Sequence, residues 1–589
     1  MVQKKRLYHQ PKKSKFSFSG PSSRLALLAV IFFIFGGIII LRMFNVQVWQ
    51  HSFYKALASG QHELYQKLFP ARGEIFVQDK YASDDQYCIA TNHVLSLMYA
   101  IPDQVENPEE IAKKLLPYLD LDYDTVYARL SKEDDVYEPL KHKVSDVEKE
   151  IISDMDLAGI VFIEEDWRYY AEAEYFAHLT GFVGYNSEDQ KQGVYGLEAY
   201  FDDELAGEQG YLKSEKDAGG RLIPVGDQLI EEAVDGDGII LTIDHNIQYF
   251  ACNKLQEAVE RHGANKGSVI IVNPKTGAIL TMCNYPSYDP NHYEDVEDGS
   301  VFVNDAVADQ YEPGSVFKIF TMAAGLDSGK IIPESTYEDT GEVKIGPYTI
   351  KNSDGKANGI QTMIDVLEKS LNTGSIHVAE QVGANSFYRY FANFGFGDYS
   401  GIDINGENSG DLSGLETGKE IYMATASFGQ GLTVTPIQLL MAGAAIANQG
   451  TLMKPYLVEK TIKPDGTEIE NTPQEVRQVI SPSAATALSA MMVKVIDNGH
   501  AAHAAVDGYY LAGKTGTAQV SREDGNGYDQ NRHKDSFIGF GPLADPQFVI
   551  LVKLDEPKDV LWSASSAAPL FGEIAEYIVN YLHIPPDRN

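Results

Sequence analysis

Three short motifs constrain this chain more than any other feature of its sequence. In chain order they are Ser315-Val-Phe-Lys318, Ser370-Leu-Asn372 and Lys514-Thr-Gly-Thr517. Together they supply a nucleophile, a base, a proton relay and a cradle for a carboxylate. This is the set that is needed to open an amide bond through a covalent serine intermediate. Each motif is weak alone, and their occurrence together and in this order is what indicates such a site.

The first motif follows Pro313-Gly314 and opens the helical run 316–324. We therefore expect Ser315 at a helix N-terminus, where the dipole and the free amides favour developing negative charge. Lys318 would lie one turn later on the same face, within reach of the Ser315 hydroxyl. Taken alone, the motif is more typical of an N-cap serine beside a solvated lysine.

The second motif follows the predicted helix 362–369 and precedes Thr373-Gly374. A loop that breaks the helix can direct Ser370 and Asn372 into a cleft. The alternative for this segment alone is an ordinary C-terminal cap.

The third motif lies beside the predicted strand 509–512. Gly516 would let a substrate backbone come close to that strand, and Lys514, Thr515 and Thr517 would hold a carboxylate. An ordinary turn is the alternative.

The N-terminus has the pattern of a membrane anchor. Residues 1–24 hold seven basic residues and no acidic one. The uncharged apolar stretch 25–41 follows and is closed by Arg42, and Met43, Phe44 and Val46 extend it toward the roughly 20 residues that span a bilayer. Because Lys and Arg stay on the cytoplasmic side, we expect residues 1–24 inside, a single transmembrane helix at 25–44, and the remainder outside the cell membrane. A cleaved signal peptide is the alternative, but its apolar region is usually shorter, and no small-residue cleavage site follows the run.

Composition excludes other classes of protein. The net charge of −36 argues against nucleic-acid binding, which needs dense Lys and Arg. Cys88, Cys252 and Cys283 are odd in number and contain no Cys-x-x-Cys pair, so we read them as three isolated thiols. The His residues show no ligand spacing either, and we expect no metal and no cofactor.

The rest of the chain divides at the turn cluster 235–238. The region 45–235 is mixed, with a predicted helix at 107–116, a capping box that begins at Ser145, and a strand at 159–163. The region 236–589 is richer in long elements. They are a strand at 239–243, helices at 246–262 and 570–582, and two hairpins, 268–272 with 278–282 and 536–540 with 548–552. We predict an α/β (α+β) fold in which helices pack on an antiparallel sheet.

Several longer segments resemble one family, the class B penicillin-binding proteins, which are membrane-anchored peptidoglycan transpeptidases. The segments that carry the resemblance are 311–318, 241–248, 285–291, 426–432 and 435–438, together with 72–75 and 196–198 in the mixed region. The resemblance implies an N-terminal anchor, an extended pedestal domain at 45–235, and a transpeptidase domain at 236–589 whose antiparallel sheet is packed between helices.

The resemblance also implies roles for the motif residues. Ser315 would attack the carbonyl between the two terminal D-alanines of a stem peptide, and neutral Lys318 would remove its proton. The proton relay to the departing D-alanine would be Ser370, assisted by Lys514, while Asn372 orients the substrate amide. The terminal carboxylate would bind Thr515 and Thr517, and the backbone amides of Ser315 and Thr517 would form the oxyanion hole. A neighbouring stem amine would complete the crosslink, and β-lactams would stall the acyl-enzyme. The implied protein partners are a membrane glycosyltransferase and other cell-wall synthesis proteins.

The sequence departs from the family at two places in the pedestal. Val77-Gln-Asp-Lys80 replaces a usual Asp-Arg-Asn-Gly turn, and Tyr170 replaces a usual Pro. Both departures bear on partner contacts rather than on catalysis. No added module is expected after the last helix.

Three alternatives stay open. A carboxypeptidase or β-lactamase would use water in place of the amine, although no Glu-x-x-Leu-Asn segment lies between Ser370 and Lys514. A scaffold or drug sensor would be acylated without catalytic purpose. Within the family, the pedestal and the segment 426–431 favour septal crosslinking at division over sidewall elongation.

Overall fold

A computed structural model describes residues 35–36, 63–68, 70–82, 85–132, 135, 137–186, 191–215, 229–522 and 527–588. The predicted basic tail lies outside these residues, as does the predicted anchor apart from Phe35 and Gly36. In the part of the chain that is described, no helix has both the length and the apolar character that crossing a bilayer requires.

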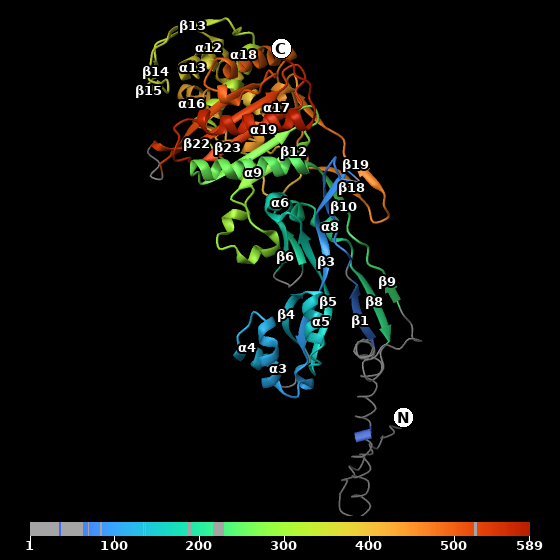
Figure 1. The fold of residues 1–589 in the computed structure, drawn as a ribbon. Helices are drawn as coiled ribbons and strands as arrows, with labels where there is room; N and C mark the ends of the chain where they lie inside the picture. Colours follow the sequence, from blue (N-terminus) through green and yellow to red (C-terminus); the bar gives the residue numbers. More distant parts are fainter. Residues whose placement is uncertain are drawn as a thin grey trace, which may run out of the picture. The chain divides into compact units, whose positions relative to one another are not determined.

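The chain forms two compact units. The first comprises residues 1–69 and 209–233, and the second comprises 70–208 and 234–589. In the first unit, β1 (Glu63–Leu68), β8 (Gly210–Glu215) and β9 (Leu229–Glu231) form an antiparallel sheet in the order β1-β8-β9. All other elements named below belong to the second unit. Figure 1 labels the main helices and strands and colours them by sequence position.

A seven-stranded sheet joins the 70–170 region to strands much later in the chain. Its order is β19-β18-β10-β2-β3-β4, and β5 also pairs with β3. The strands are β2 (Ile75–Gln78), β3 (Gln86–Ala100), β4 (Glu138–Val144), β5 (Ile160–Tyr170), β10 (Gly238–Asp244), β18 (Val458–Ile462) and β19 (Glu468–Glu470). Beside them, α3 (Pro108–Leu115), α4 (Tyr123–Leu130) and α5 (Asp146–Ser153) bury a small separate core. The predicted helix after Asn107 and the capping box at Ser145 are both confirmed.

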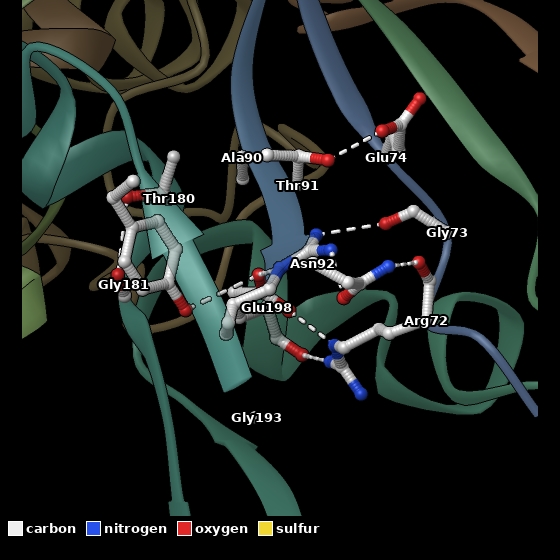
Figure 2. A network of polar contacts seen from close by, with 12 residues as sticks. Arg72, Gly73, Glu74, Ala90, Thr91, Asn92, Thr180, Gly181, Gly193 and Glu198 are labelled. Atoms are coloured by element: carbon white, nitrogen blue, oxygen red, sulfur yellow. Dashed lines mark hydrogen bonds and ion pairs between the residues drawn. The ribbon is translucent and has the colours of Figure 1, made fainter. Parts of the chain in front are cut away.

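A buried ion cluster holds this region together. Glu198 in α7 (Gly196–Tyr200) is 0 % exposed, and it accepts hydrogen bonds from Arg72 Nε at 2.6 Å and Arg168 Nε at 2.7 Å. Figure 2 shows Arg72 reaching Glu198, while Asn92 donates to the Arg72 carbonyl. Burial opposes ionisation of Glu198, but the two guanidinium groups hold its pKa below the ordinary value.

The central sheet of the second unit is antiparallel, with the order β12-β11-β23-β22-β21. Its strands are β11 (Lys266–Val272), β12 (Ile279–Tyr285), β21 (Ala512–Ser521), β22 (Tyr528–Gly541) and β23 (Phe548–Asp555). Both predicted hairpins are therefore present, as β11–β12 and β22–β23. The strand predicted at 509–512 is wrong in its placement, because β21 begins at Ala512 and contains the third motif itself.

Helices cover both faces of this sheet. On one face, α19 (Ala567–Tyr581) packs against β22 and β23 and against α9 (His245–His262), which also covers β12. On the other face, α17 (Pro436–Ala447), which is buried at every residue, packs against β11, β22 and β23. Successive residues of β22 face the two sides, since Ile538 lies against Gly443 of α17 and Gly539 against Phe571 of α19. The predicted antiparallel sheet between helices is thus confirmed.

Further helices carry or support the motif residues. They are α11 (Lys318–Asp327), α12 (Met363–Glu368), α13 (Asn372–Val382), α14 (Ala384–Asn393), α16 (Glu420–Ala426) and α18 (Pro482–Asp497). In the core, α11 packs against α13, α14 and α18.

One expectation about the cysteines is wrong. Cys252 and Cys283 form a disulfide with 5.5 Å between their Cα atoms, and Cys88 alone of the three is a free thiol. The disulfide arises because α9 packs on β12, which brings together two residues that are 31 positions apart in sequence. No local spacing pattern signals such a contact.

Candidate active site

The first motif occupies a tight turn before a buried helix. Ser315 lies in a 3₁₀ turn, η6 (Gly314–Phe317), and α11 begins only at Lys318. The expected α-helical N-terminus at Ser315 is therefore displaced by one turn. Gly314 has a φ of +60°, and its N–H donates to the carbonyl of Gly429 at 3.0 Å. A glycine suits this position because φ is positive and a Cβ would come within 3.1 Å of Ala518.

Lys318 joins the first motif to the second. Its Nζ lies 3.1 Å from Ser315 Oγ and 3.1 Å from Ser370 Oγ, and it donates to the Ser370 carbonyl at 2.6 Å. The whole side chain is 0 % exposed. A buried amine at this place is thus in contact with two hydroxyl groups.

Ser370 lies in the turn between α12 and α13, as the helix-breaking pattern predicts. Its φ of +55° is in the left-handed region, which is uncommon for a residue with a side chain. Strained backbone of this kind persists where the surroundings fix it, and here two lysines do so. Lys514 Nζ lies 3.1 Å from Ser370 Oγ, so residues from all three motifs meet at this hydroxyl.

The third motif lies on the edge strand of the central sheet. Lys514 is 1 % exposed, and its Nζ also donates to the carbonyl and the Oγ1 of Thr515, at 3.1 and 3.2 Å. A Cβ on Gly516 would approach the Pro313 carbonyl to 2.9 Å, so the glycine allows β21 to pack against the turn that holds Ser315. Among the described residues, β21 has a neighbouring strand, β22, on one side only.

Asn372 makes a different contact from the one expected. It is the first residue of α13, and its side-chain amide donates to the carbonyl of Lys351 at 2.9 Å. The neighbouring Thr373 donates to buried Asp339 at 2.8 Å, and the side chain of Asn352 donates to both Asp339 oxygens at 3.0 Å. This network fixes the first turn of α13, next to Ser370.

Burial sets the protonation of the two lysines. It lowers the pKa of Lys514 to about 7. Burial also lowers the pKa of Lys318 well below its ordinary value, and the charge of Lys514 lowers it further. Among the described residues neither lysine forms an ion pair with a carboxylate. Both effects favour the neutral form of Lys318, which can accept the proton of the Ser315 hydroxyl.

Sequence reasoning did not identify Ser563. Its N–H donates to Thr517 Oγ1 at 3.2 Å, and the Thr517 hydroxyl donates to Ser563 Oγ at 3.1 Å. The sequence contains no signal for this contact, because Ser563 stands in a loop 46 positions after Thr517.

One cavity in the structure lies away from the motif residues. A cavity of about 350 Å³ is lined by residues such as Tyr200, Asp403 and Tyr456 and includes none of the motif residues. Within the described ranges, no group of three or more His, Cys, Asp or Glu side chains is placed to hold a metal ion.

Family models match most of the chain. One, described as "Penicillin binding protein transpeptidase domain", matches residues 267–576. Another, described as "Penicillin-binding Protein dimerisation domain", matches residues 67–241.

Individual known proteins are also similar to this chain over most of its length. Stage V sporulation protein D of Bacillus subtilis is 34% identical over 88% of this chain and 80% of its own length. A protein of Neisseria gonorrhoeae named "Probable peptidoglycan D,D-transpeptidase PenA" is 30% identical over 98% of this chain and 95% of its own. Penicillin binding protein 3 of Mycobacterium tuberculosis, in complex with aztreonam, shares the fold, with a TM-score of 0.68 and 24% identity over 88% of this chain and 98% of that one.

Proposed function

Because this chain belongs to the penicillin-binding protein transpeptidase family, we propose that its peptidoglycan D,D-transpeptidase activity proceeds through an acyl-enzyme on Ser315. The chain carries the transpeptidase and dimerisation domains of the class B members. The observation that carries the proposal is the meeting of three motifs at one hydroxyl, since Ser370 Oγ lies 3.1 Å from both Lys318 Nζ and Lys514 Nζ.

Acylation begins at Ser315. Neutral Lys318 takes the proton of the Ser315 hydroxyl, which lies 3.1 Å from its Nζ. The Oγ then attacks the carbonyl between the two terminal D-alanines of the donor stem peptide. The backbone N–H groups of Ser315 and Thr517 stabilise the oxyanion.

Ser370 carries the proton to the leaving group. Its Oγ is in contact with protonated Lys318 and with Lys514, so it can receive a proton and pass it to the amide nitrogen as the C–N bond breaks. Free D-alanine leaves, and the acyl group stays on Ser315. The amine of a second stem peptide then attacks the ester, forms the new amide and returns the proton through the same groups.

Substrate recognition is assigned to the edge strand. Thr515 and Thr517 bind the terminal carboxylate, and Gly516 lets the donor peptide approach β21, whose outer edge has no neighbouring strand among the described residues. Asn372 remains our proposal for orienting the substrate amide, which requires its side chain to leave the Lys351 carbonyl when substrate binds.

The acceptor distinguishes this function from hydrolysis. No carboxylate contacts Ser315, Lys318, Ser370 or Lys514 within the described residues, and activation of water for deacylation needs a placed base. The test supplies a stem peptide that ends in D-Ala-D-Ala, with and without an amine acceptor. We expect D-alanine release to depend on the acceptor and the product to be crosslinked. Release at the same rate without acceptor, giving only the shortened peptide, would assign the chain to the carboxypeptidases.

The cellular role is a second part of the proposal. We propose a septal enzyme, anchored by residues 25–44 with residues 1–24 in the cytoplasm, a pedestal at 45–235 and a catalytic domain at 236–589 outside the membrane. The segment 426–431 supports the septal role. A membrane glycosyltransferase is the proposed partner. Depletion that gives filamentous cells supports division, whereas depletion that gives rounded cells assigns the chain to elongation.

A further inference from the structure

A buried histidine lies behind the strand that carries the third motif. His533 on β22 is 7 % exposed. Its Nδ1 lies 2.9 Å from Oδ1 of Asp535, and its Nε2 lies 3.2 Å from the carbonyl oxygen of Val560. Both partners are acceptors, whereas a neutral imidazole has one N–H. Only the imidazolium, with an N–H on each nitrogen, can therefore donate both hydrogen bonds.

The charged groups around the ring favour this protonated form. They are the carboxylates of Asp535, on the same strand, and Glu556, at the end of β23, where Glu556 is also paired with Arg532. The hydrogen bond to Asp535 is the main cause that raises the pKa of His533, and it outweighs the opposing effect of burial. Two further groups at this pair are uncharged: Gln519 of β21 lies opposite His533, and Ser566 donates to Asp535 at 2.5 Å.

The loop 556–563 connects His533 to the third motif. It leaves β23 and ends at Ser563, where η8 (Ser563–Ser565) begins. Leu561 and Trp562 are 75% and 53% exposed, so little packing holds the middle of the loop. Polar contacts hold its two ends. On the side of β23, the Lys558 N–H donates to the His262 carbonyl and Asp559 lies 2.9 Å from His262 Nδ1. Nearer the motif, the Val560 carbonyl contacts His533 and Ser563 contacts Thr517.

Ser563 in turn fixes the Thr517 hydroxyl. The two hydroxyl oxygens lie 3.1 Å apart, and the Ser563 N–H donates to the Thr517 oxygen. Two neighbouring hydroxyls match the two oxygens of a carboxylate. The position of the loop therefore determines whether the Thr517 and Ser563 hydroxyls lie side by side where a carboxylate could bind.

We propose that His533 is a positioning residue for the substrate carboxylate, because its imidazolium fixes Val560 and so holds Ser563 against Thr517. This inference rests on the proposed function, in which Thr517 binds that carboxylate. When the imidazolium loses a proton, the remaining N–H stays on the Asp535 carboxylate and the hydrogen bond to the Val560 carbonyl is lost. The segment from Val560 to Ser563 is then released and carboxylate binding weakens. The proton leaves as pH rises through the raised pKa of His533, so tight binding is a property of the lower pH range.

The binding step and the chemical step then respond to pH in opposite directions. Acylation after binding speeds up with pH as Lys318 becomes neutral, while binding weakens as His533 becomes neutral. Rapid-mixing kinetics with a fluorescent penicillin on the full-length chain separate the dissociation constant from the acylation rate constant. Over about pH 6 to 9, a range that brackets imidazole titration, we expect the dissociation constant of the wild type to rise about three- to tenfold, as for loss of one hydrogen bond.

Two variants test the assignment. His533→Gln offers a neutral donor that does not titrate, so its dissociation constant should stay flat with pH, near the high-pH value of the wild type. Asp535→Asn removes the carboxylate that raises the pKa of His533, so the rise should move to lower pH. A His533→Gln chain whose dissociation constant follows the wild type at every pH would overturn the proposal.

Substitution of the buried residues His533 and Asp535 can disturb folding, so a further measurement uses the wild-type sequence at these two positions. Trp562 stands between Val560 and Ser563, and its emission can be isolated as the difference between the wild type and Trp562→Phe. We expect this emission to titrate at the same pH as the dissociation constant, and emission that is constant over the range contradicts loop release. Wild type that forms no penicillin adduct refutes the proposed function itself, whereas a normal adduct with a pH-independent dissociation constant refutes only the role of His533.

Discussion

Lys318 and Lys514 lie on either side of one hydroxyl group, each with its Nζ 3.1 Å from Ser370 Oγ. Neither amine is exposed to more than 1 %. Two buried amines that share a hydroxyl cannot both stay protonated at low cost, and burial lowers the pKa of each. This relationship supports the proposal that Lys318 acts as the base.

The acid limb of the pH profile of the acylation rate constant should depend on the coupling between Lys318 and Lys514. Because Lys514 lowers the pKa of Lys318, Lys514→Met should raise the pKa of Lys318 and shift the acid limb of the acylation rate constant to higher pH. Acylation kinetics with penicillin at a series of pH values measure the limb. Lys275→Met, at a partly exposed surface lysine, is the control and should leave the limb in place. A limb that does not move in Lys514→Met contradicts the coupling.

Removal of the base should affect rate but not folding. Lys318→Met keeps an unbranched side chain in a fully buried position and deletes the amine, so acylation should slow by about a hundred- to ten-thousand-fold. Thermal unfolding should show no loss of stability, because a buried amine is replaced by an apolar group. Acylation at the wild-type rate would mean that another group takes the Ser315 proton.

Gly516 should tolerate no side chain. A Cβ there would lie 2.5 Å from Ser536 Oγ and 2.9 Å from the Pro313 carbonyl, so Gly516→Ala must displace β21 or the active-serine turn. We expect a loss of about 1 to 3 kcal/mol in unfolding free energy together with slower acylation. Gly299→Ala is a matched control, since its nearest neighbour would be 3.9 Å away. Equal behaviour of the two variants in denaturant unfolding and penicillin labelling would refute the packing argument.

The buried cluster around Glu198 should matter for stability alone. Glu198→Ala leaves Arg72 and Arg168 without their shared carboxylate, and breaking a buried ion pair in this way costs about 3 to 5 kcal/mol. Denaturant unfolding measures the loss. Glu109→Ala, which breaks an exposed pair with Lys113, should have no measurable effect. Folded Glu198→Ala protein should still be labelled by penicillin, and unchanged stability would contradict the account of the cluster.

The sequence predicted secondary structure correctly where the pattern that signals an element lies within a few neighbouring residues. The β11–β12 hairpin, α9 and the capping box at Ser145 each follow from periodicity or turn chemistry within a few residues. The meeting of Ser315, Ser370 and Lys514 required the resemblance to a known family, because separations of 55 and 144 residues carry no contact signal of their own.

What could not be predicted depends on packing between distant segments. The Cys252–Cys283 disulfide exists because α9 lies on β12, and the Thr517–Ser563 contact because the loop before α19 returns to the edge strand. The predicted strand at 509–512 was wrong, because the glycine and the polar residues of Lys514-Thr-Gly-Thr517 are also typical of a turn. In the structure these residues pair with β22 and form part of the strand β21.

Labelling with a fluorescent penicillin, wild type beside Ser315→Ala, tests the central claim most directly. The account predicts a stable covalent adduct on the wild type, mapped by mass spectrometry to the peptide that contains Ser315, and no adduct on the variant. An adduct that persists in folded Ser315→Ala protein, or its absence from folded wild type, would contradict the proposal that the three motifs form a serine acylation site.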